Sequence, residues 1–557
     1  MWLLALVICL SLRLLAGAIS YISRWRTRRR YSVAPSATII GFFHPFCAGG
    51  GGGERVLWRA VHTLSHLPKE VDMPLHVLIY TGDLSMKPEE ILSGVSRQFD
   101  ITIDVAAVPV SFVYLRGRGL LDALLYPVFT MLAQSVASAV VAVEALFRGT
   151  PDVFIDTTGY AFSFPVAWCA GCTVGTYVHY PTISTDMLSR VRNQRPSHNN
   201  SDWIASSVTV SKTKLLYYRA FARLYGIAGG CFSSKVMVNS SWTKGHIAAL
   251  WKLSPPPSLV FPPCDTSELE ALPINDRRRE RCALSVGQFR PEKDHALQVR
   301  ALAALRKLPS SRSNPSLDDV GLVILGSCRN DSDREVLRRT QELAVELGLE
   351  DRVKFVVNCS FNELKAWLGR ASVGLHTMWN EHFGIGVVEM MAAGMVTIAH
   401  RSGGPEADIV VPLSDGRITG FLAETPEEYA EAMARVFGSQ NAAYTTGTGS
   451  SGSEGVRTEH IVQSGVGGSI DLSCGDGSSC VGLVGTTEFG ERGGYEEEKT
   501  QRGGGENGIF SIEAIRVAGR ESARRFSNDV FDRTFAVEFV DLLQRRRPVN
   551  RTRRKEE

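Results

Sequence analysis

Short apolar runs typical of buried strands alternate with amphipathic helical segments in two series along this chain. The runs cover residues 37–43, 75–80, 101–110, 152–156, 173–178 and 235–239 in the first series, and 283–286, 320–325, 353–357, 372–376 and 396–400 in the second. Such alternation is typical of parallel sheets with helices on both faces. It predicts an α/β fold of two Rossmann-like, doubly wound parallel-sheet domains that face a cleft.

Breaks in this alternation predict the domain boundaries. Proline clusters within residues 255–263 end the first series, so the expected domains are residues 36–265 and 280–437. Residues 438–507 are rich in Gly, Ser, Thr and Glu, and their apolar residues recur with neither the helical nor the strand period. This composition predicts a disordered insertion. Helical periodicity resumes over residues 511–546, and we expect these helices to pack back on the domains.

The chain begins with an apolar segment followed by a basic cluster. Residues 2–22 are apolar apart from Arg13 and small polar residues, and residues 24–30 are mostly arginine. About 20 apolar residues span a bilayer core, and positive charge on the C-terminal side keeps the following chain in the cytosol. We predict a single-pass signal anchor over residues 1–30 and cytosolic domains. Eleven scattered cysteines also fit a reducing compartment.

A second apolar segment, residues 120–147, follows the basic Arg116-Gly-Arg118. Its charges and many small residues argue against a bilayer span and leave two alternatives, a long buried helix or a helix that lies on the membrane. The formal net charge is only +3. Because the acid-free basic excess is confined to the N-terminus, the composition does not indicate a nucleic-acid-binding protein.

A run of five glycines, residues 49–53, separates the first strand from a helix over residues 54–67. Glycines at this place let the backbone approach a ligand at the carboxyl edge of the sheet. The alternative is a dinucleotide site. However, the run lacks the Gly-x-Gly-x-x-Gly spacing, and the second predicted strand does not end in an acidic residue. A nicotinamide cofactor is therefore poorly supported.

Two glutamates, Glu381 and Glu389, flank a Gly-x-Gly within residues 380–394. The polar residues before Phe383 predict a loop that contains Glu381, and the apolar residues after it predict a helix that contains Glu389 and ends at Gly394 with a left-handed cap. The free N–H groups of the first turn of such a helix bind anions, above all phosphate. The alternative is a capping carboxylate plus an ordinary surface glutamate.

Further candidate residues follow predicted strands. His179 ends strand 173–178, where open α/β sheets carry their sites; the alternative is a structural hydrogen bond. Arg290 and Lys293 lie in the turn after strand 283–286. The chain's Asp331-Ser-Asp333 precedes a predicted helix and is interpreted as its cap, so no metal site is predicted.

These segments resemble the retaining glycosyltransferases of family four, which have the GT-B fold. The Glu381 to Glu389 spacing and the 287–293 turn carry the general likeness. Residues 44–58, 156–162, 178–184 and 288–295 are similar to the members that add α-1,2-linked mannose to dolichol-linked oligosaccharides. The likeness covers about residues 37–437 and 511–543.

The resemblance implies GDP-mannose as the donor and a dolichol-diphosphate-linked trimannosyl-chitobiose as the acceptor. Two α-1,2-mannoses would be added at the cytosolic face of the endoplasmic reticulum membrane, for protein N-glycosylation. It implies neither a metal nor another cofactor and no nucleic acid, and other mannosyltransferases of the pathway are possible partners. The first domain would be the acceptor side and the second would bind the donor.

The same resemblance implies roles for individual residues. His179, Glu381, Lys293 and Arg290 would act at the transferred sugar and the diphosphate. The donor would also be bound by Gly51, Gly52, Gly53, Phe383, Gly384, Ile385, Gly386, Val387 and Glu389. The family's arginine after the strand-ending glycine is replaced by Gln288 here, which makes Arg290 the expected substitute.

Two rival interpretations remain open from the sequence. One is a transferase of the same fold that uses another nucleotide sugar or another lipid acceptor. The other is a non-catalytic scaffold of a membrane glycosylation complex. A scaffold would be expected to have lost donor residues, and Glu381, Glu389 and Lys293 are all present.

Overall fold

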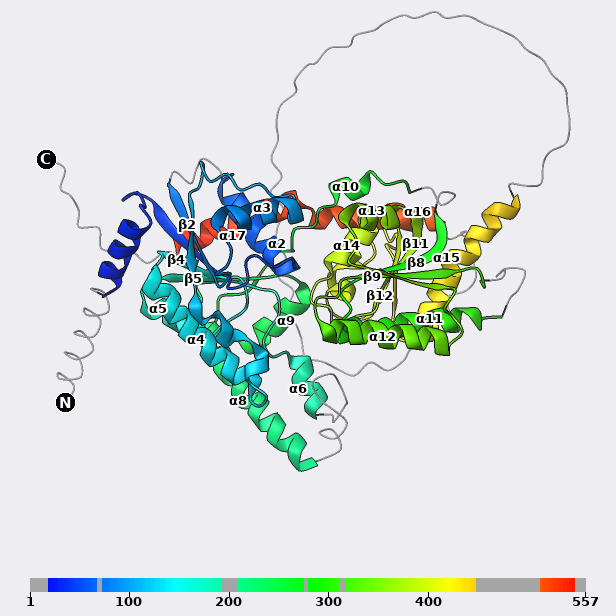
Figure 1. Ribbon diagram of the computed structural model, residues 1–557, viewed down its shortest axis with the longest axis horizontal. Helices are drawn as coiled ribbons and strands as arrows, with labels where there is room; N and C mark the ends of the chain where they lie inside the picture. The colour runs from blue at the N-terminus through cyan, green and yellow to red at the C-terminus, as the bar shows by residue number, and fades with distance from the viewer. Residues whose placement is uncertain are drawn as a thin grey trace, which may run out of the picture. The chain divides into compact units, whose positions relative to one another are not determined.

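Two parallel β-sheets form the framework of the protein (Figure 1). The computed structural model describes residues 19–67, 73–192, 208–274, 279–309, 317–446 and 511–545. The first 18 residues of the predicted anchor and most of the predicted insertion lie outside these ranges.

The N-terminal sheet has the strand order β3-β2-β1-β4-β5-β6-β7, and every neighbouring pair is parallel. Its strands are β1 (Thr38–Phe43), β2 (Leu75–Thr81), β3 (Val110–Tyr114), β4 (Val153–Asp156), β5 (Thr173–Val178), β6 (Lys235–Val238) and β7 (Ser258–Leu259). Its helices are α2 (Gly52–Leu64), α3 (Pro88–Phe99), α4 (Thr130–Arg148), α5 (Ser163–Cys169), α6 (Thr185–Arg192), α8 (Val208–Phe232) and α9 (Ser241–Leu250). The central strands are buried throughout, as a sheet covered on both faces requires.

The C-terminal sheet is also parallel, with the order β10-β9-β8-β11-β12-β13. Its strands are β8 (Glu280–Val286), β9 (Gly321–Gly326), β10 (Val353–Val357), β11 (Ala371–His376), β12 (Val396–His400) and β13 (Phe421–Ala423). The helices around it are α10 (Ser267–Glu270), α11 (His295–Arg306), α12 (Asp331–Glu346), α13 (Phe361–Arg370), α14 (Ile385–Ala392) and α15 (Pro426–Thr446). The predicted α/β architecture of two doubly wound parallel sheets is confirmed.

Each sheet begins with an inner strand. From β1 the chain moves outward to β2 and β3 and then returns to pair β4 with the other side of β1, and β8 to β11 repeat this path. The loops after β1 and β8 therefore open at the point where the strand order reverses, which is where open α/β sheets bind ligands. These two loops contain the glycine run and the turn with Lys293.

Two element predictions in the first domain were wrong. Only Val110 of the predicted strand 101–110 lies in a strand, because the Asp104 carboxylate accepts hydrogen bonds from the Ala106 and Ala107 N–H groups and turns the chain before β3. The apolar segment 120–147 is not one helix. Two short 3₁₀ turns precede α4, and Phe129 adopts a left-handed conformation, with a φ of 53°, at its start.

The first residues of the predicted insertion are helical. Helix α15 continues through Thr446, past the expected boundary at residue 438, while residues 447–510 lie outside the described structure. Buried Tyr429, Met433 and Phe437 attach this helix to the C-terminal core. The short strand β13 was not anticipated, because three residues carry too little periodicity.

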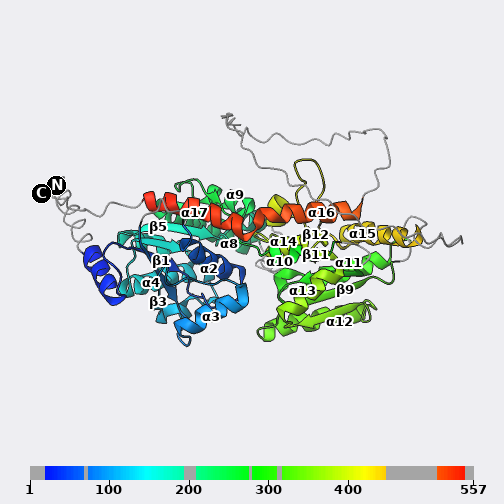
Figure 2. The same cartoon turned by 90° about the horizontal axis from the view of Figure 1, so that it is seen from above.

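The last two helices connect the C-terminal domain back to the N-terminal one (Figure 2). Helix α16 (Ile512–Ala523) packs beside α14, and α17 (Asn528–Gln544) packs against α2. Phe531, Phe535 and Phe539 of α17 are buried in the N-terminal core. At the surface of this contact Asp532 pairs with Arg59 of α2.

Three arginines from distant segments bind the carbonyl end of α14. Arg516 donates to the Gly394 carbonyl at 2.8 Å, Arg520 to that of Ala392 at 2.8 Å, and Arg279 to that of Ala393. Positive charge is favourable at the C-terminal end of a helix dipole. The arginines therefore fix the helix whose first turn was predicted to bind an anion.

The basic cluster after the predicted anchor is partly used inside the fold. Residues 19–30 are helical, and Arg24 and Arg28 both pair with Asp152 just before β4. The Ser20 hydroxyl donates to the Ala170 carbonyl. Two arginines of the predicted basic flank thus compensate the charge of a buried carboxylate of the domain.

Candidate functional site

Glu381 lies in a loop between β11 and α14 and is held by two bases. Its Oε2 atom is 2.6 Å from the Lys293 ammonium and 3.2 Å from the His376 ring at the end of β11. Burial favours the neutral acid, yet Lys293 and His376 hold the pKa of Glu381 well below its usual value. The carboxylate is thus ionised, with a cation beside it.

The backbone around Glu381 is fixed by a second loop. Asn380 has a φ of 52°, and its N–H donates to the Ser402 hydroxyl. The Gly404 N–H donates to the Glu381 carbonyl at 2.7 Å. A Cβ at Gly403, whose φ is 65°, would lie 2.3 Å from that carbonyl oxygen, so only glycine fits.

Helix α14 begins directly after this loop. Gly384 caps it with a φ of 110°, and Gly394 follows it with a φ of 80°. Glu381 lies in the loop and Glu389 in the helix, as predicted. The N–H groups of Ile385 and Gly386 precede the first intrahelical hydrogen bonds, whereas the Val387 N–H donates to the Gly384 carbonyl at 2.9 Å. Phe383 is buried beneath this turn.

The glycine run is packed more closely than the sequence suggested. Gly51 caps α2, and its N–H donates to the Glu54 carboxylate at 2.9 Å. The carboxylate oxygens of Glu54 lie 2.7 Å from the positions that a Cβ would take at Gly49 and Gly51, so a side chain at either glycine would displace Glu54. At Gly52 a Cβ would lie 2.9 Å from Ile385 Cδ1, so the start of α2 lies beside the start of α14.

His179 lies at the end of β5, as predicted, and faces the glycine run. Its Nε2 atom is buried and has no hydrogen-bond partner among the described residues, and it lies 3.7 Å from the position of a Cβ on Gly53. Burial, together with the neighbouring His44, lowers the pKa of His179 to about 3. A neutral ring nitrogen is therefore available to a ligand group at this place.

Arg55 is a site residue that the sequence analysis missed. It lies two residues after the glycine run, in the first turn of α2, and its guanidinium is 3.3 Å from the Glu389 carboxylate. The two expected acids of the site are thus each paired with a base, Glu381 with Lys293 and Glu389 with Arg55.

His382 is held by aromatic rings of the other domain. Its ring stacks on Tyr180 with centroids 4.1 Å apart and on Trp242 at 5.7 Å. Beside it the Asn380 amide donates to Asp186, which also lies 3.4 Å from His246. These contacts join the Glu381 loop to the segment that follows β5 and to α9.

The other residues missed by the sequence analysis share one property. His376, Tyr180, Asp186 and Trp242 lie in loops or at element ends, and the sequence analysis gave none of them a role. His376 could have been found, because it ends a predicted strand at the same sheet edge as the glutamate loop. The aromatic contacts depend on the packing of distant segments, which no local pattern reports.

Arg290 is not brought to these acids. Its guanidinium is 41% exposed and lies 3.8 Å from Glu292. Gln288 turns its carbonyl to the His295 ring. The Asp331-Ser-Asp333 segment lies in the first turn of α12, and Asn330, not either aspartate, caps that helix.

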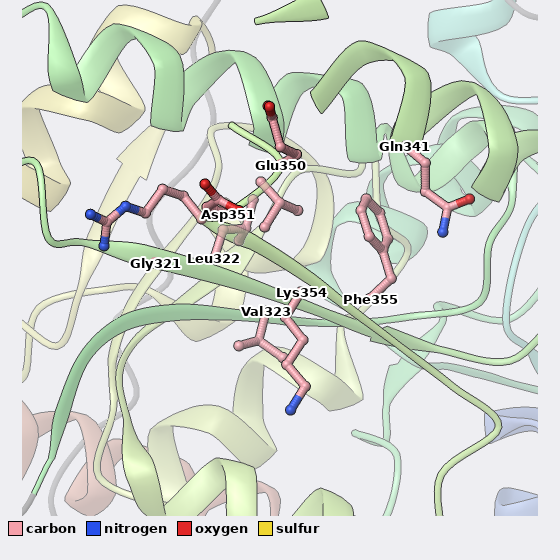
Figure 3. Close-up of a pocket in the computed structure, with 10 residues that line it drawn as sticks. Gly321, Leu322, Val323, Gln341, Glu350, Asp351, Lys354 and Phe355 are labelled. Atoms are coloured by element: carbon pink, nitrogen blue, oxygen red, sulfur yellow. The ribbon is translucent and has the colours of Figure 1, made fainter. Parts of the chain in front are cut away.

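A surface hollow at β9 and β10 contains none of the candidate residues. Glu350, Asp351 and Lys354 are among its lining residues (Figure 3). Among the residues that the structure describes, no group of three or more His, Cys, Asp or Glu side chains is arranged to hold a metal ion.

Known proteins match both halves of the chain. Residues 37–251 match the family described as ALG11 mannosyltransferase N-terminus, and residues 270–446 match glycosyl transferases group 1. The N-terminal domain of a Candida albicans trehalose-6-phosphate phosphatase has a similar structure, with a TM-score of 0.51 and 11% identity over 92% of this chain and 97% of that one. That likeness concerns the fold alone.

Two mammalian relatives are much more similar in sequence. The protein named GDP-Man:Man(3)GlcNAc(2)-PP-Dol alpha-1,2-mannosyltransferase from Mus musculus is 48% identical over 75% of this chain and 84% of its own length. Its namesake from Homo sapiens is 49% identical over 72% of this chain and 79% of its own length. The resemblance stated from the sequence is confirmed, and the chain belongs to the family of GDP-Man:Man(3)GlcNAc(2)-PP-Dol alpha-1,2-mannosyltransferases.

Proposed function

We propose that this chain transfers mannose from GDP-mannose to Man(3)GlcNAc(2)-PP-Dol in α-1,2 linkage. The similarity to the mouse relative over most of both chains carries this proposal. The site supports it, because Lys293, Glu381 and Glu389 are present around the start of α14. Two successive additions on the same acceptor are part of the proposal.

The donor diphosphate would lie at the first turn of α14. Its negative charge suits the N–H groups of residues 385 and 386 and the dipole of the helix. Lys293 would turn from Glu381 to the phosphates as the leaving group gains charge, which is electrostatic stabilisation without a metal. Arg290 lies two residues after Gln288 and is exposed. It would add a second positive charge in place of the family's arginine, which is Gln288 in this chain.

The remaining residues would bind the sugars of the donor. Glu389 would accept hydrogen bonds from the ribose hydroxyls and Glu381 from the mannose hydroxyls. The neutral Nε2 atom of His179 would accept from another mannose hydroxyl, while Gly52 and Gly53 would let the donor approach the backbone. Transfer would retain the anomeric configuration, and no side chain is assigned as a covalent nucleophile.

We further propose that the chain is anchored in the endoplasmic reticulum membrane by the signal anchor predicted within residues 1–30, with its domains in the cytosol. A second membrane contact is supported by α4, the one described helix that is long and apolar enough to be a candidate span. Val136, Val140, Val143 and Phe147 form a row on its surface, and each is more than half exposed. Such a face suits a lipid surface that also carries the acceptor.

The decisive experiment is transfer from labelled GDP-mannose to a trimannosyl-chitobiose lipid acceptor by membranes that contain the protein. Products longer by one and two residues, and sensitive to an α-1,2-mannosidase, are expected. A failure to extend this acceptor while another lipid-linked sugar is extended would favour a different transferase. Absence of transfer to every acceptor, with GDP still bound, would favour a scaffold subunit.

A further inference from the structure

We infer that Arg55 is a positioning residue for the donor, which keeps Glu389 charged and aimed at the ribose hydroxyls. The inference rests on the proposed role of Glu389. Arg55 comes from the N-terminal domain and Glu389 from the C-terminal domain. Donor recognition would thus depend on a residue outside the domain that is expected to bind the donor.

The position of Arg55 directs its guanidinium to the Glu389 carboxylate. Its guanidinium is 3.3 Å from the Glu389 Oε1 atom, and the side chains of Arg55 and Glu389 are 15% and 25% exposed. Both residues lie about one turn inside their helices, and the two helix starts touch where Gly52 meets Ile385. Arg55 therefore reaches Glu389 from the side on which α14 begins.

The surroundings of Glu389 other than Arg55 disfavour its ionised form. Asp265, after β7, repels it, and buried Cys264 lies next to that aspartate. Burial and, to a lesser degree, Asp265 raise the pKa of Glu389, while Arg55 lowers it. Arg55 is the cation that opposes protonation of this carboxyl group.

The charge of Glu389 matters for the ligand it would bind. A carboxylate accepts hydrogen bonds from two hydroxyls and binds them more strongly than a neutral acid does. Because a protonated carboxyl group must donate one hydrogen, it can no longer accept at both oxygens. A donor bound through its ribose would therefore lose affinity when Glu389 is protonated.

The test is the affinity of the full-length protein for GDP, measured by calorimetry in detergent between pH 5.5 and 8. Arg55→Met should weaken GDP binding about tenfold or more at pH 7. Because loss of Arg55 raises the pKa of Glu389, the variant's affinity should also begin to fall at a higher pH than that of the wild type. Arg55→Lys should restore most of the affinity.

Arg59→Met is the matched control. Arg59 lies one turn further along α2 and pairs with Asp532 of α17, away from Glu389. It should lower thermal stability and leave GDP affinity and its pH profile unchanged. If Arg55→Met keeps the wild-type affinity, or loses affinity with an unshifted pH profile, Arg55 is not a positioning residue.

Glu389→Ala separates this inference from the proposed function. If Glu389→Ala binds GDP with wild-type affinity, Glu389 is not part of the donor site. This result would overturn both the inference about Arg55 and the proposed role of Glu389. Weak binding in Glu389→Ala together with normal binding in Arg55→Met would overturn only the role of Arg55. Weak binding in both, and no further loss in the double variant, is the result expected when the two residues act as one unit.

Discussion

At the scale of single residues, the ion pair of Lys293 and Glu381 links stability to function. The ammonium is 26% and the carboxylate 15% exposed, so each group depends on the other for compensation of its charge. Lys293→Met should lower the free energy of unfolding at pH 7 by about 2 kcal/mol. It should also reduce kcat/KM by about 100-fold or more, because a charge at the leaving group is lost.

The stability effect of Lys293→Met should depend on pH. The pKa of Glu381 is lower in the folded than in the unfolded protein. The contribution of the pair is thus present above the unfolded pKa of about 4.3 and is lost as pH falls through the folded pKa. Urea unfolding at pH 7 and below pH 4 checks this. Lys365→Met, which breaks an exposed pair with Glu268, should change stability little; an equal loss in both variants would contradict the prediction.

Gly403 should be required for the position of Glu381. A side chain there would meet the Glu381 carbonyl at 2.3 Å and strain a φ of 65°. Gly403→Ala should reduce activity about 100-fold, because a shift of about 1 Å at a reacting group has this effect. Gly416→Ala is the control, since its φ of 85° is equally strained but nothing lies within 4 Å. Assays of mannose transfer compare the two, and similar activities would show that the contact is unimportant.

At the scale of elements, the arginines behind α14 form a support for the site. Arg516 is completely buried and binds the carbonyls of Ser372, near the start of β11, and of Gly394, just after α14. Arg516→Met should lower the free energy of unfolding by about 3 kcal/mol, because two charge-assisted hydrogen bonds are lost. Chemical denaturation measures this, with Arg533→Met on the exposed face of α17 as the control. A loss below about 1 kcal/mol would show that the carbonyls find other donors.

At the scale of the whole molecule, the row of four apolar residues on α4 predicts a second membrane contact. A chain without residues 1–18 should still float with anionic vesicles, because the row remains exposed and can enter the interface. Replacement of all four residues by serine should release the truncated chain and leave the full-length chain bound. Release of the truncated chain with the row intact would show that the N-terminal segment is the only anchor.

Local patterns were sufficient for the two sheets and for much of the candidate site. Strand periodicity gave both parallel domains, and the placement of Glu381 in a loop and Glu389 in a helix followed from polarity and glycine positions. Patterns failed where one side chain changed the local course of the chain. Asp104 turns residues that have strand composition, and α15 continues through Thr446 although the residues after 438 show no helical period of apolar residues.

The sequence by itself therefore determined the fold class, the family and the chemical types available to a donor, because these depend on residue identity and spacing along the chain. Only the tertiary structure decided which charges meet. Arg55 and Glu389 are 334 positions apart, and Tyr180 and His382 lie in different domains. Contacts of this kind arise from the packing of two domains, and spacing along the chain carries no information about them.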